Sequence, residues 1–185
     1  MLGWRGVSRN LHDWEIEAFK MARGVYGGSN LQMMLPFVRT IEEARSMRCS
    51  LEQVHNLQSG QDGLKIIQMS ELPSNALLAK QFLEEFDGFS IGSNDMTQIT
   101  LGVDRDSGGP IASTFDERNP AVKVMLHLAI SACRKHNKYV GICGQGPSDH
   151  PDFAKWLVEE GIDTVSLNPD TVIELSLYTS PSPRD

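Results

Sequence analysis

The sequence predicts an α/β fold of parallel strands joined by helices. Short apolar runs are each followed by a polar loop and a helical pattern, about five times, with roughly 25 to 50 residues between successive strands. Crossovers of this length join parallel strands. About five units cannot close an eight-unit barrel. The chain is therefore either an open α/β sheet or an incomplete, carboxyl-terminal part of a (β/α)8 TIM-type barrel.

The first half of the chain predicts two strands and three helices. A helical repeat spans residues 10–23, and an apolar run at 31–38 predicts a strand that contains Pro36. Thr40 and Glu43 form a capping box for a helix ending near residue 54, and a second strand covers 64–69. Ser74 or Asn75 can cap a helix that ends at Phe86.

The second half predicts three more strands, at 89–91, 139–143 and 164–167, and two helices, at 120–136 and 152–160. Asn119 caps the first of these helices and Gly161 stops the second. The side chains expected to face the core are Ile41, Ala44, Met47, Leu51, Leu78, Phe82, Phe86, Val124, Leu128 and Ala132.

Bulk composition bounds the class of protein. A chain of 185 residues with 40% hydrophobic content can form one globular domain. The net charge of -7 argues against nucleic acid as a partner. No apolar stretch approaches the roughly 20 residues of a membrane helix, so we expect no membrane association and a cytoplasmic location. The three cysteines, Cys49, Cys133 and Cys143, have neither disulfide nor zinc-site spacing.

The chemistry is predicted to lie at the carboxyl ends of the strands. Glu71, Asp95 and Cys143 each lie at or just after a predicted strand end, which converges them on one face. In the segment 88–109, which we expect to be a loop, Gly92 lets a ligand approach the backbone and Asn94 tolerates unusual backbone angles. This segment can offer N–H groups to an anion and a carboxylate to a metal.

Several segments together resemble the phosphoenolpyruvate (PEP)/pyruvate-binding barrel of the PEP-utilising enzymes, the family of PEP synthase, pyruvate phosphate dikinase and enzyme I. Two of them, LGVDRD at 101–106 and CGQGPS at 143–148, look more like the synthase branch. The resemblance implies the incomplete barrel rather than the open sheet. The matching segments are residues 1–6, 34–40, 70–75, 88–98, 101–106 and 141–148.

The resemblance implies a reversible phosphoryl transfer between a phosphohistidine and the enolate of pyruvate. Glu71 and Asp95 fall on the family's Mg²⁺ ligands, and hard carboxylate oxygens suit that ion. Cys143 falls on the residue that exchanges a proton with carbon 3 of pyruvate. Arg5 matches an arginine that faces the phosphoryl group. The residues implied to bind the substrate are Arg5, Glu71, Gly92, Ser93, Asn94 and Asp95, largely by main-chain donors in the segment 92–95.

Departures from the family pattern shape the expected organisation. We expect a partial PEP/pyruvate-binding domain at residues 1–176 and a disordered, non-native tail at 177–185. The implied parent enzyme also has a nucleotide-binding domain and a phosphohistidine domain, and the latter would be a partner of this site. No glycine-rich phosphate loop occurs here, so the chain alone should not use ATP and the fragment alone should be inactive.

Each assignment has a simpler alternative. Cys49 and Cys133 are expected to be small buried side chains, and Arg39 and Arg105 to be surface residues unless a loop brings them to the site. None of the five histidines is offered as the phosphorylated one. A dikinase fragment is the alternative within the family. Outside enzymes, the alternative is a non-catalytic fragment that binds partners or forms a homodimer.

Overall fold

A computed structural model describes residues 12–106 and 108–173, so Arg5 and the predicted tail lie outside the described residues. Five strands form one parallel sheet in chain order. They are β1 (Met33–Leu35), β2 (Ile66–Ser70), β3 (Gly88–Gly92), β4 (Tyr139–Cys143) and β5 (Thr164–Val165). Doubly wound sheets reverse their strand order at a switch point, whereas barrels keep the chain order. The fold is therefore a partial barrel.

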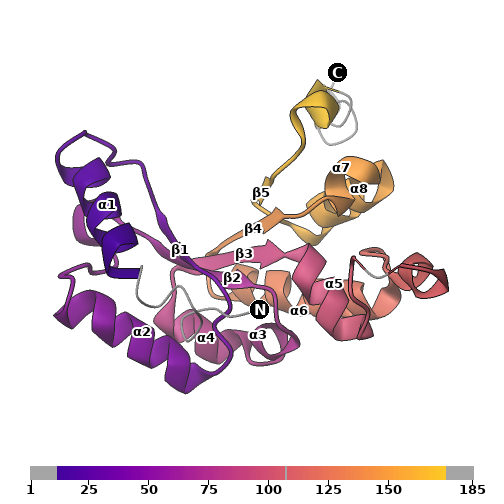
Figure 1. Cartoon of the computed structure of the whole chain (residues 1–185), viewed down its shortest axis with the longest axis horizontal. Coiled ribbons are helices and arrows are strands. Elements are labelled where there is room, and N and C mark those ends of the chain that lie inside the picture. The colour runs from indigo at the N-terminus through magenta and orange to yellow at the C-terminus, as the bar shows by residue number, and fades with distance from the viewer. Residues whose placement is uncertain (1–11, 107, 174–185) are drawn as a thin grey trace.

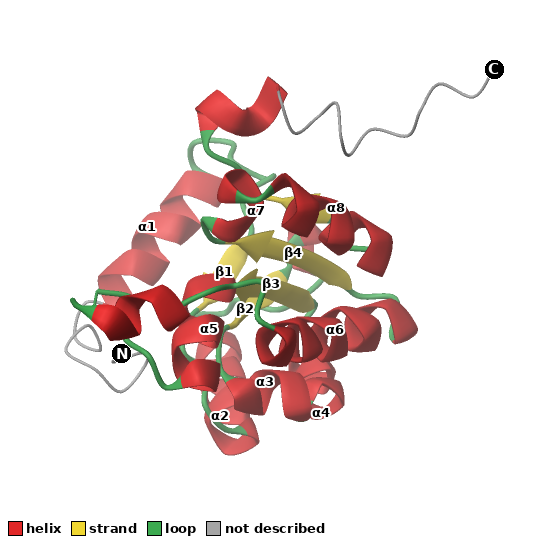
Figure 2. Ribbon diagram, turned by 90° about the vertical axis from the view of Figure 1, so that its right-hand side faces the viewer, coloured by secondary structure: helices red, strands yellow, loops and turns green. Residues whose placement is uncertain are grey.

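Helices cover the convex side of the curved sheet (Figure 1). Figure 2 shows the same layering after a quarter turn, with α3, α4 and α6 packed below the strands. The α-helices are α1 (His12–Gly24), α2 (Ile41–Gln53), α3 (Pro73–Leu77), α4 (Ala79–Glu85), α5 (Ser93–Leu101), α6 (Pro120–Lys135), α7 (Gly146–Asp149) and α8 (Pro151–Glu160). Short 3-10 turns are η3 (Gln61–Gly63), η4 (Pro110–Thr114) and η5 (Pro169–Thr171).

Strand side chains alternate between the helix layer and the concave side of the sheet. Leu35, Phe89 and Val140 lie in the buried core with the helices. The intervening positions face the concave side and are smaller or more exposed. On β3 and β4 the register pairs Ser90 with Gly141 and Gly92 with Cys143. Cys143 and Gly92 are therefore neighbours on the concave side, at the carboxyl ends of their strands.

Several predicted helix ends are confirmed by the contacts they make. Thr40 caps α2 by accepting a hydrogen bond from the Glu43 N–H at 3.1 Å, although the Glu43 carboxylate reaches back to the Arg39 N–H. Asn119 caps α6 by accepting from the Ala121 N–H at 2.9 Å. Gly161 ends α8 with φ +88°, a conformation that favours glycine.

The predicted helix from Ser74 to Phe86 is wrong in its continuity. It breaks at Leu78, which has φ -109° and ψ 26° and is 41% exposed rather than buried. The first part, α3, begins at Pro73. Asn75 is therefore not the residue that precedes the helix; it lies within the first turn, and its side chain accepts a hydrogen bond from the Leu72 N–H. Phe82 and Phe86 are buried as expected.

The predicted buried face of α6 is also wrong. Val124 and Leu128 are 54% and 37% exposed, and Ala132 is only partly buried. Apolar residues occur at helical spacing on two faces of α6, so periodicity alone could not choose between them. Cys133 is buried as expected, whereas Cys49 is exposed on α2. The residues of α6 that face the core are Val122, Leu126, Ala129, Ile130 and Cys133.

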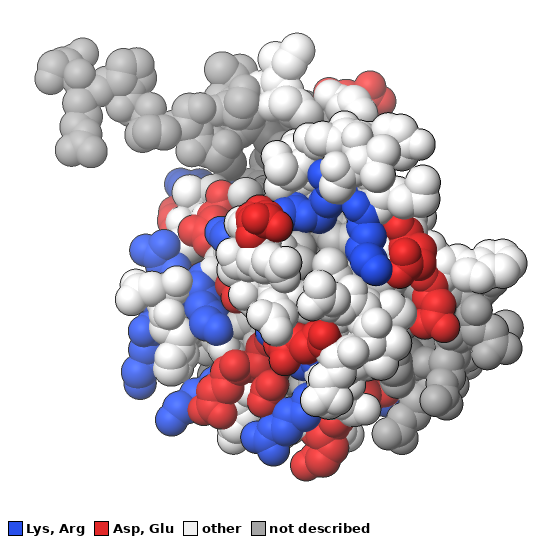
Figure 3. Space-filling model, turned by 90° about the vertical axis from the view of Figure 1, so that its left-hand side faces the viewer, with Lys and Arg blue, Asp and Glu red and all other residues white. Residues whose placement is uncertain are grey.

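Charged side chains of both signs are interspersed on the face shown in Figure 3. Ion pairs at the surface include Lys20 with Glu17 on α1, and Arg45 on α2 with Glu85 on α4. Exposed pairs of this kind contribute about 0 to 1 kcal/mol each, so they affect solubility more than stability. Within the described part of the chain, no helix combines the length and apolarity that crossing a membrane requires.

We predict that the isolated chain associates in solution, because β1 and β5 are the outer strands of the sheet and leave pairing groups unused. Met34 lies on edge strand β1 and is 45% exposed. Met34→Lys should shift the chain towards monomer in sedimentation velocity, because an edge lysine opposes strand pairing. The matched control Val124→Lys, on the outer face of α6, should leave association unchanged. A wild-type chain that stays monomeric at high concentration would refute the prediction.

Candidate active site

Glu71 immediately follows β2 and points its carboxylate across the end of β3. Its side chain is 2% exposed, and Oε1 accepts a hydrogen bond from the Phe37 N–H at 2.6 Å. A Cβ added at Gly92 would lie 3.0 Å from Glu71 Cβ and 3.3 Å from Oε2. Gly92 therefore leaves the space that the glutamate occupies.

Asn75 fixes the backbone that carries Glu71. Its Oδ1 accepts from the Glu71 N–H at 3.2 Å and the Leu72 N–H at 3.0 Å, and its Nδ2 donates to the Val38 carbonyl at 2.8 Å. The side chain is fully buried, so these bonds are shielded from water. Asn75 thus joins the loops that follow β1 and β2.

Glu71 and Asp95 form a pair of carboxylates close enough for the charge of one to affect the pKa of the other. Burial raises the pKa of Glu71 to about 7; the hydrogen bond from Phe37 opposes the rise, and the charge of Asp95 adds to it. Two carboxylates that repel each other in this way favour a cation between them. Within the described residues no larger cluster of His, Cys, Asp and Glu suits a metal ion. The pair fits Mg²⁺, which commonly takes one or two carboxylates plus substrate and water oxygens.

A pH dependence of stability follows from Glu71 in the absence of metal. The ordinary pKa of glutamate is 4.5 and that of Glu71 is about 7, so the folded chain binds one more proton between these values. We predict that the free energy of unfolding falls as pH rises through this window, by about 3 kcal/mol at most. Urea unfolding at pH 5 and pH 8 measures it. Glu71→Gln should flatten the profile; an unaltered profile would assign the effect elsewhere.

Residues 92–95 form the start of a helix, which the prediction of a loop had missed. Gly92 precedes α5, and the first-turn N–H groups of a helix are suited to an anion. Ser93 is fully buried, and its hydroxyl donates to the Cys143 carbonyl at 3.3 Å, so its main-chain N–H rather than its side chain can meet a ligand. Asp95 lies in the first turn of α5 and is half-buried.

Cys143 is the last residue of β4, beside Gly92. Its Sγ lies 3.8 Å from Ser90 Oγ and 3.5 Å from the Ile91 carbonyl oxygen, and the side chain is half-buried. Cys133, on α6, is buried in the core, and this burial raises its pKa to about 12, so we expect an inert thiol there. The carboxyl ends of β2, β3 and β4 therefore bring Glu71, Gly92 and Cys143 together along the carboxyl-terminal edge of the sheet.

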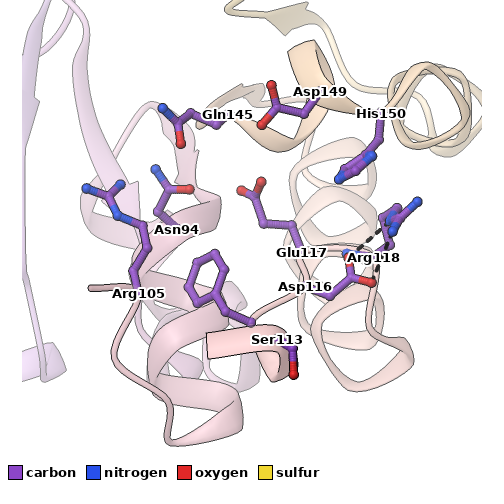
Figure 4. Close-up of a pocket in the computed structure, with 10 residues that line it drawn as sticks. Asn94, Arg105, Ser113, Asp116, Glu117, Arg118, Gln145, Asp149 and His150 are labelled. Atoms are coloured by element: carbon purple, nitrogen blue, oxygen red, sulfur yellow. Dashed lines mark hydrogen bonds and ion pairs between the residues drawn. The ribbon is translucent and has the colours of Figure 1, made fainter. Parts of the chain in front are cut away.

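Two further charged residues border this edge, and the sequence-based prediction had not assigned either to it. Arg105 and Glu117 line a polar cavity of about 320 Å³ that reaches the site at Asn94 (Figure 4). Arg105 is exposed and pairs with Asp106, as expected of a surface residue, and its loop also brings it to this cavity. Glu117 is 6% exposed, and burial raises its pKa. Its burial depends on segments more than 20 residues away, which sequence spacing does not reveal.

The fold and the site define a class: part of a parallel (β/α) barrel with a carboxylate pair, a helix start and a thiol at the carboxyl ends of its strands. Solved structures confirm the fold alone. RipC from Yersinia pestis matches with a TM-score of 0.58 at 11% identity, over 82% of this chain and 65% of that one. The citrate synthase SbnG matches with a TM-score of 0.53 at 16% identity, over 80% and 60%.

Sequence comparison is more specific. The family model of the PEP-utilising enzyme, PEP-binding domain, matches residues 1–179. PEP synthase of Neisseria meningitidis is 64% identical over 96% of this chain and 23% of its own length. That of Escherichia coli is 58% identical over 94% and 23%, and that of Aeropyrum pernix 44% over 95% and 22%. The chain therefore belongs to the family of PEP-utilising enzymes. It spans about a quarter of the length of these relatives.

Proposed function

We propose that the chain is the PEP/pyruvate half-site of a PEP synthase, a pyruvate, water dikinase. The site would transfer a phosphoryl group between a phosphohistidine and the enolate oxygen of pyruvate. The observation that carries the proposal is the shared edge of Glu71, the start of α5 and Cys143, in a chain 64% identical to a synthase. In the parent enzyme the overall reaction would convert ATP, pyruvate and water to AMP, PEP and phosphate.

The residues of this edge suit the parts of that reaction. Mg²⁺ bound by Glu71 and Asp95 would supply Lewis-acid stabilisation of charge on the pyruvate carbonyl oxygen. Main-chain N–H groups of residues 92–95 would bind the substrate carboxylate at the start of α5. Arg5 would face the phosphoryl group, where its planar guanidinium suits phosphate oxygens.

Cys143 would move the proton. In the direction of PEP synthesis its thiolate would take a proton from carbon 3 of pyruvate as the enolate forms, and in reverse the thiol would return it. The thiol lies on the neighbouring strand to Gly92, beside the segment proposed to bind the carboxylate. The substrate would therefore lie between the thiol and the carboxylate pair.

Calorimetric titration with oxalate, a mimic of the enolate, tests the proposal on the 185-residue chain. We expect heat that requires Mg²⁺ and disappears in Asp95→Asn. The absence of Mg²⁺-dependent heat from a folded sample would favour the non-catalytic alternative, a fragment that only binds partners or dimerises. A dikinase differs in the second phosphoryl acceptor, so the parent's consumption of water or phosphate separates the two enzymes.

A further inference from the structure

Glu117 lies in the segment between η4 and α6, outside every motif that carries the family resemblance, yet its carboxylate is buried at the edge of the site. Figure 4 shows it between Asn94, from the start of α5, and Gln145 and Asp149, from the loop and helix after β4. Burial raises the pKa of the Glu117 carboxyl, and the neighbouring Ser93 side chain and Gly146 N–H oppose that rise. One buried acid therefore contacts both segments that carry the proposed chemistry.

The fit of the loop after Cys143 against this carboxylate is close. A Cβ added at Gly144 would lie 3.0 Å from Glu117 Oε1, and one added at Gly146 would lie 2.2 Å from Oε2. Gly144 also has φ +154°, which L residues rarely adopt. The loop that follows Cys143 is thus glycine-rich where the backbone approaches Glu117.

Glu117 also determines how the Asn94 amide is oriented. Oxygen and nitrogen of an amide are assigned from their hydrogen-bond partners. The orientation that satisfies both neighbours, with the two atoms exchanged relative to Figure 4, lets the Asn94 nitrogen donate to Glu117 Oε1 at 3.2 Å. The Asn94 oxygen then accepts from Arg105 Nη1 at 3.1 Å. In this orientation the Asn94 amide bridges the Glu117 carboxylate and the Arg105 guanidinium.

We propose that Glu117 is a positioning residue that joins the start of α5 to the loop after Cys143 and, through Asn94, places the Arg105 guanidinium at the rim of the site. This inference deepens the proposed function and rests on it. Asn94 then has its side-chain nitrogen occupied by Glu117, which leaves its main-chain N–H for a ligand. Arg105, whose side chain is 47% exposed, becomes the cation that the site presents to an incoming anion.

Glu117→Gln tests the contact, because it keeps the shape but replaces two acceptor oxygens by one. Asp149→Asn is the matched control: it makes the same change in the same cavity, at an exposed residue. In ¹H–¹⁵N spectra of the 185-residue chain, Glu117→Gln should shift the side-chain amide signals of Asn94, identified by their loss in Asn94→Ala. Asp149→Asn should leave them in place. Unchanged Asn94 signals in a folded Glu117→Gln chain overturn the proposal.

Arg105→Ala keeps the test decisive if Glu117→Gln does not fold. Arg105 has an exposed side chain, so its removal leaves the core intact, and loss of its bond to the Asn94 oxygen should also shift the amide signals. Signals that do not move in Arg105→Ala contradict the assigned orientation and with it the proposal.

A second experiment measures the affinity for oxalate in the presence of Mg²⁺. Glu117→Gln should weaken it by about tenfold, as removing a partner that orients a binding residue does. In the Asn94→Ala background the further loss should be much smaller, because two residues that act through one contact are not additive. Equal losses in both backgrounds overturn the relay. If the wild-type chain gives no oxalate heat, the proposed function fails, whereas the Asn94 signals still decide whether Glu117 orients Asn94.

Discussion

Cys143→Ser should abolish the exchange of pyruvate methyl protons with solvent while leaving phosphorylation of the parent's histidine intact. A serine hydroxyl is too weak an acid to replace the thiol, and general acid–base catalysis commonly contributes about 10² to 10⁴-fold. The measurement is made by NMR in D₂O, with this chain exchanged for the matching segment of the Neisseria meningitidis synthase, which aligns over 185 residues. Histidine phosphorylation is followed with labelled ATP.

Cys49→Ser is the matched control for that variant. The substitution makes the same chemical change at an exposed position on α2, so proton exchange and histidine phosphorylation should both persist. Ser90 lies 3.8 Å from Cys143 Sγ, and the serine in Cys143→Ser can still bond to it, so the strand end should keep its structure. Equal loss of proton exchange and histidine phosphorylation in Cys143→Ser would contradict the role assigned to the thiol.

Glu71→Gln should weaken the Mg²⁺-dependent affinity for oxalate by more than about 100-fold. That value is the upper end of the loss caused by residues that only orient a ligand, and Glu71 is proposed to contact the metal itself. The neutral amide keeps the acceptor for the Phe37 N–H but removes the charge that a divalent cation needs. Calorimetry with oxalate at pH 8 measures the effect, because Glu71 is ionised there in the wild type.

The fold should survive Glu71→Gln, which separates a lost ligand from a lost structure. The amide no longer requires a charge to be buried, so the unfolding free energy at pH 8 should be equal to or above that of wild type. Glu84→Gln, at an exposed position on α4, is the control and should bind normally. Retained Mg²⁺-dependent heat in a folded Glu71→Gln chain would remove Glu71 from the metal site.

The parts of the fold that local sequence determines were predictable. Each expected strand forms, because short apolar runs bounded by polar loops have few alternatives, although β1 and β5 are shorter than expected. Helix α5 was missed because Gly92 provides no side-chain cap and Asn94 and Asp95 are weak helix formers. The family resemblance pointed to these same residues as the substrate-binding segment. The segment was therefore predicted, but its helical backbone was not.

The rest depends on contacts between distant segments. The inward face of α6 is chosen by the sheet and α3 to α5 packed against it, not by the spacing of Val124 and Leu128. Arg105 and Glu117 meet at Asn94 only because the loop between α5 and α6 folds back over the strand ends. No pattern along the chain encodes that return.

The most direct test of the account is a crystal structure of this chain with Mn²⁺, in place of Mg²⁺, and oxalate. Anomalous scattering should place the metal against the carboxylates of Glu71 and Asp95, with oxalate at the start of α5 and Cys143 Sγ within about 4 Å of it. A metal bound elsewhere, or oxalate out of reach of Cys143, would contradict the claim that one small substrate lies among these three side chains.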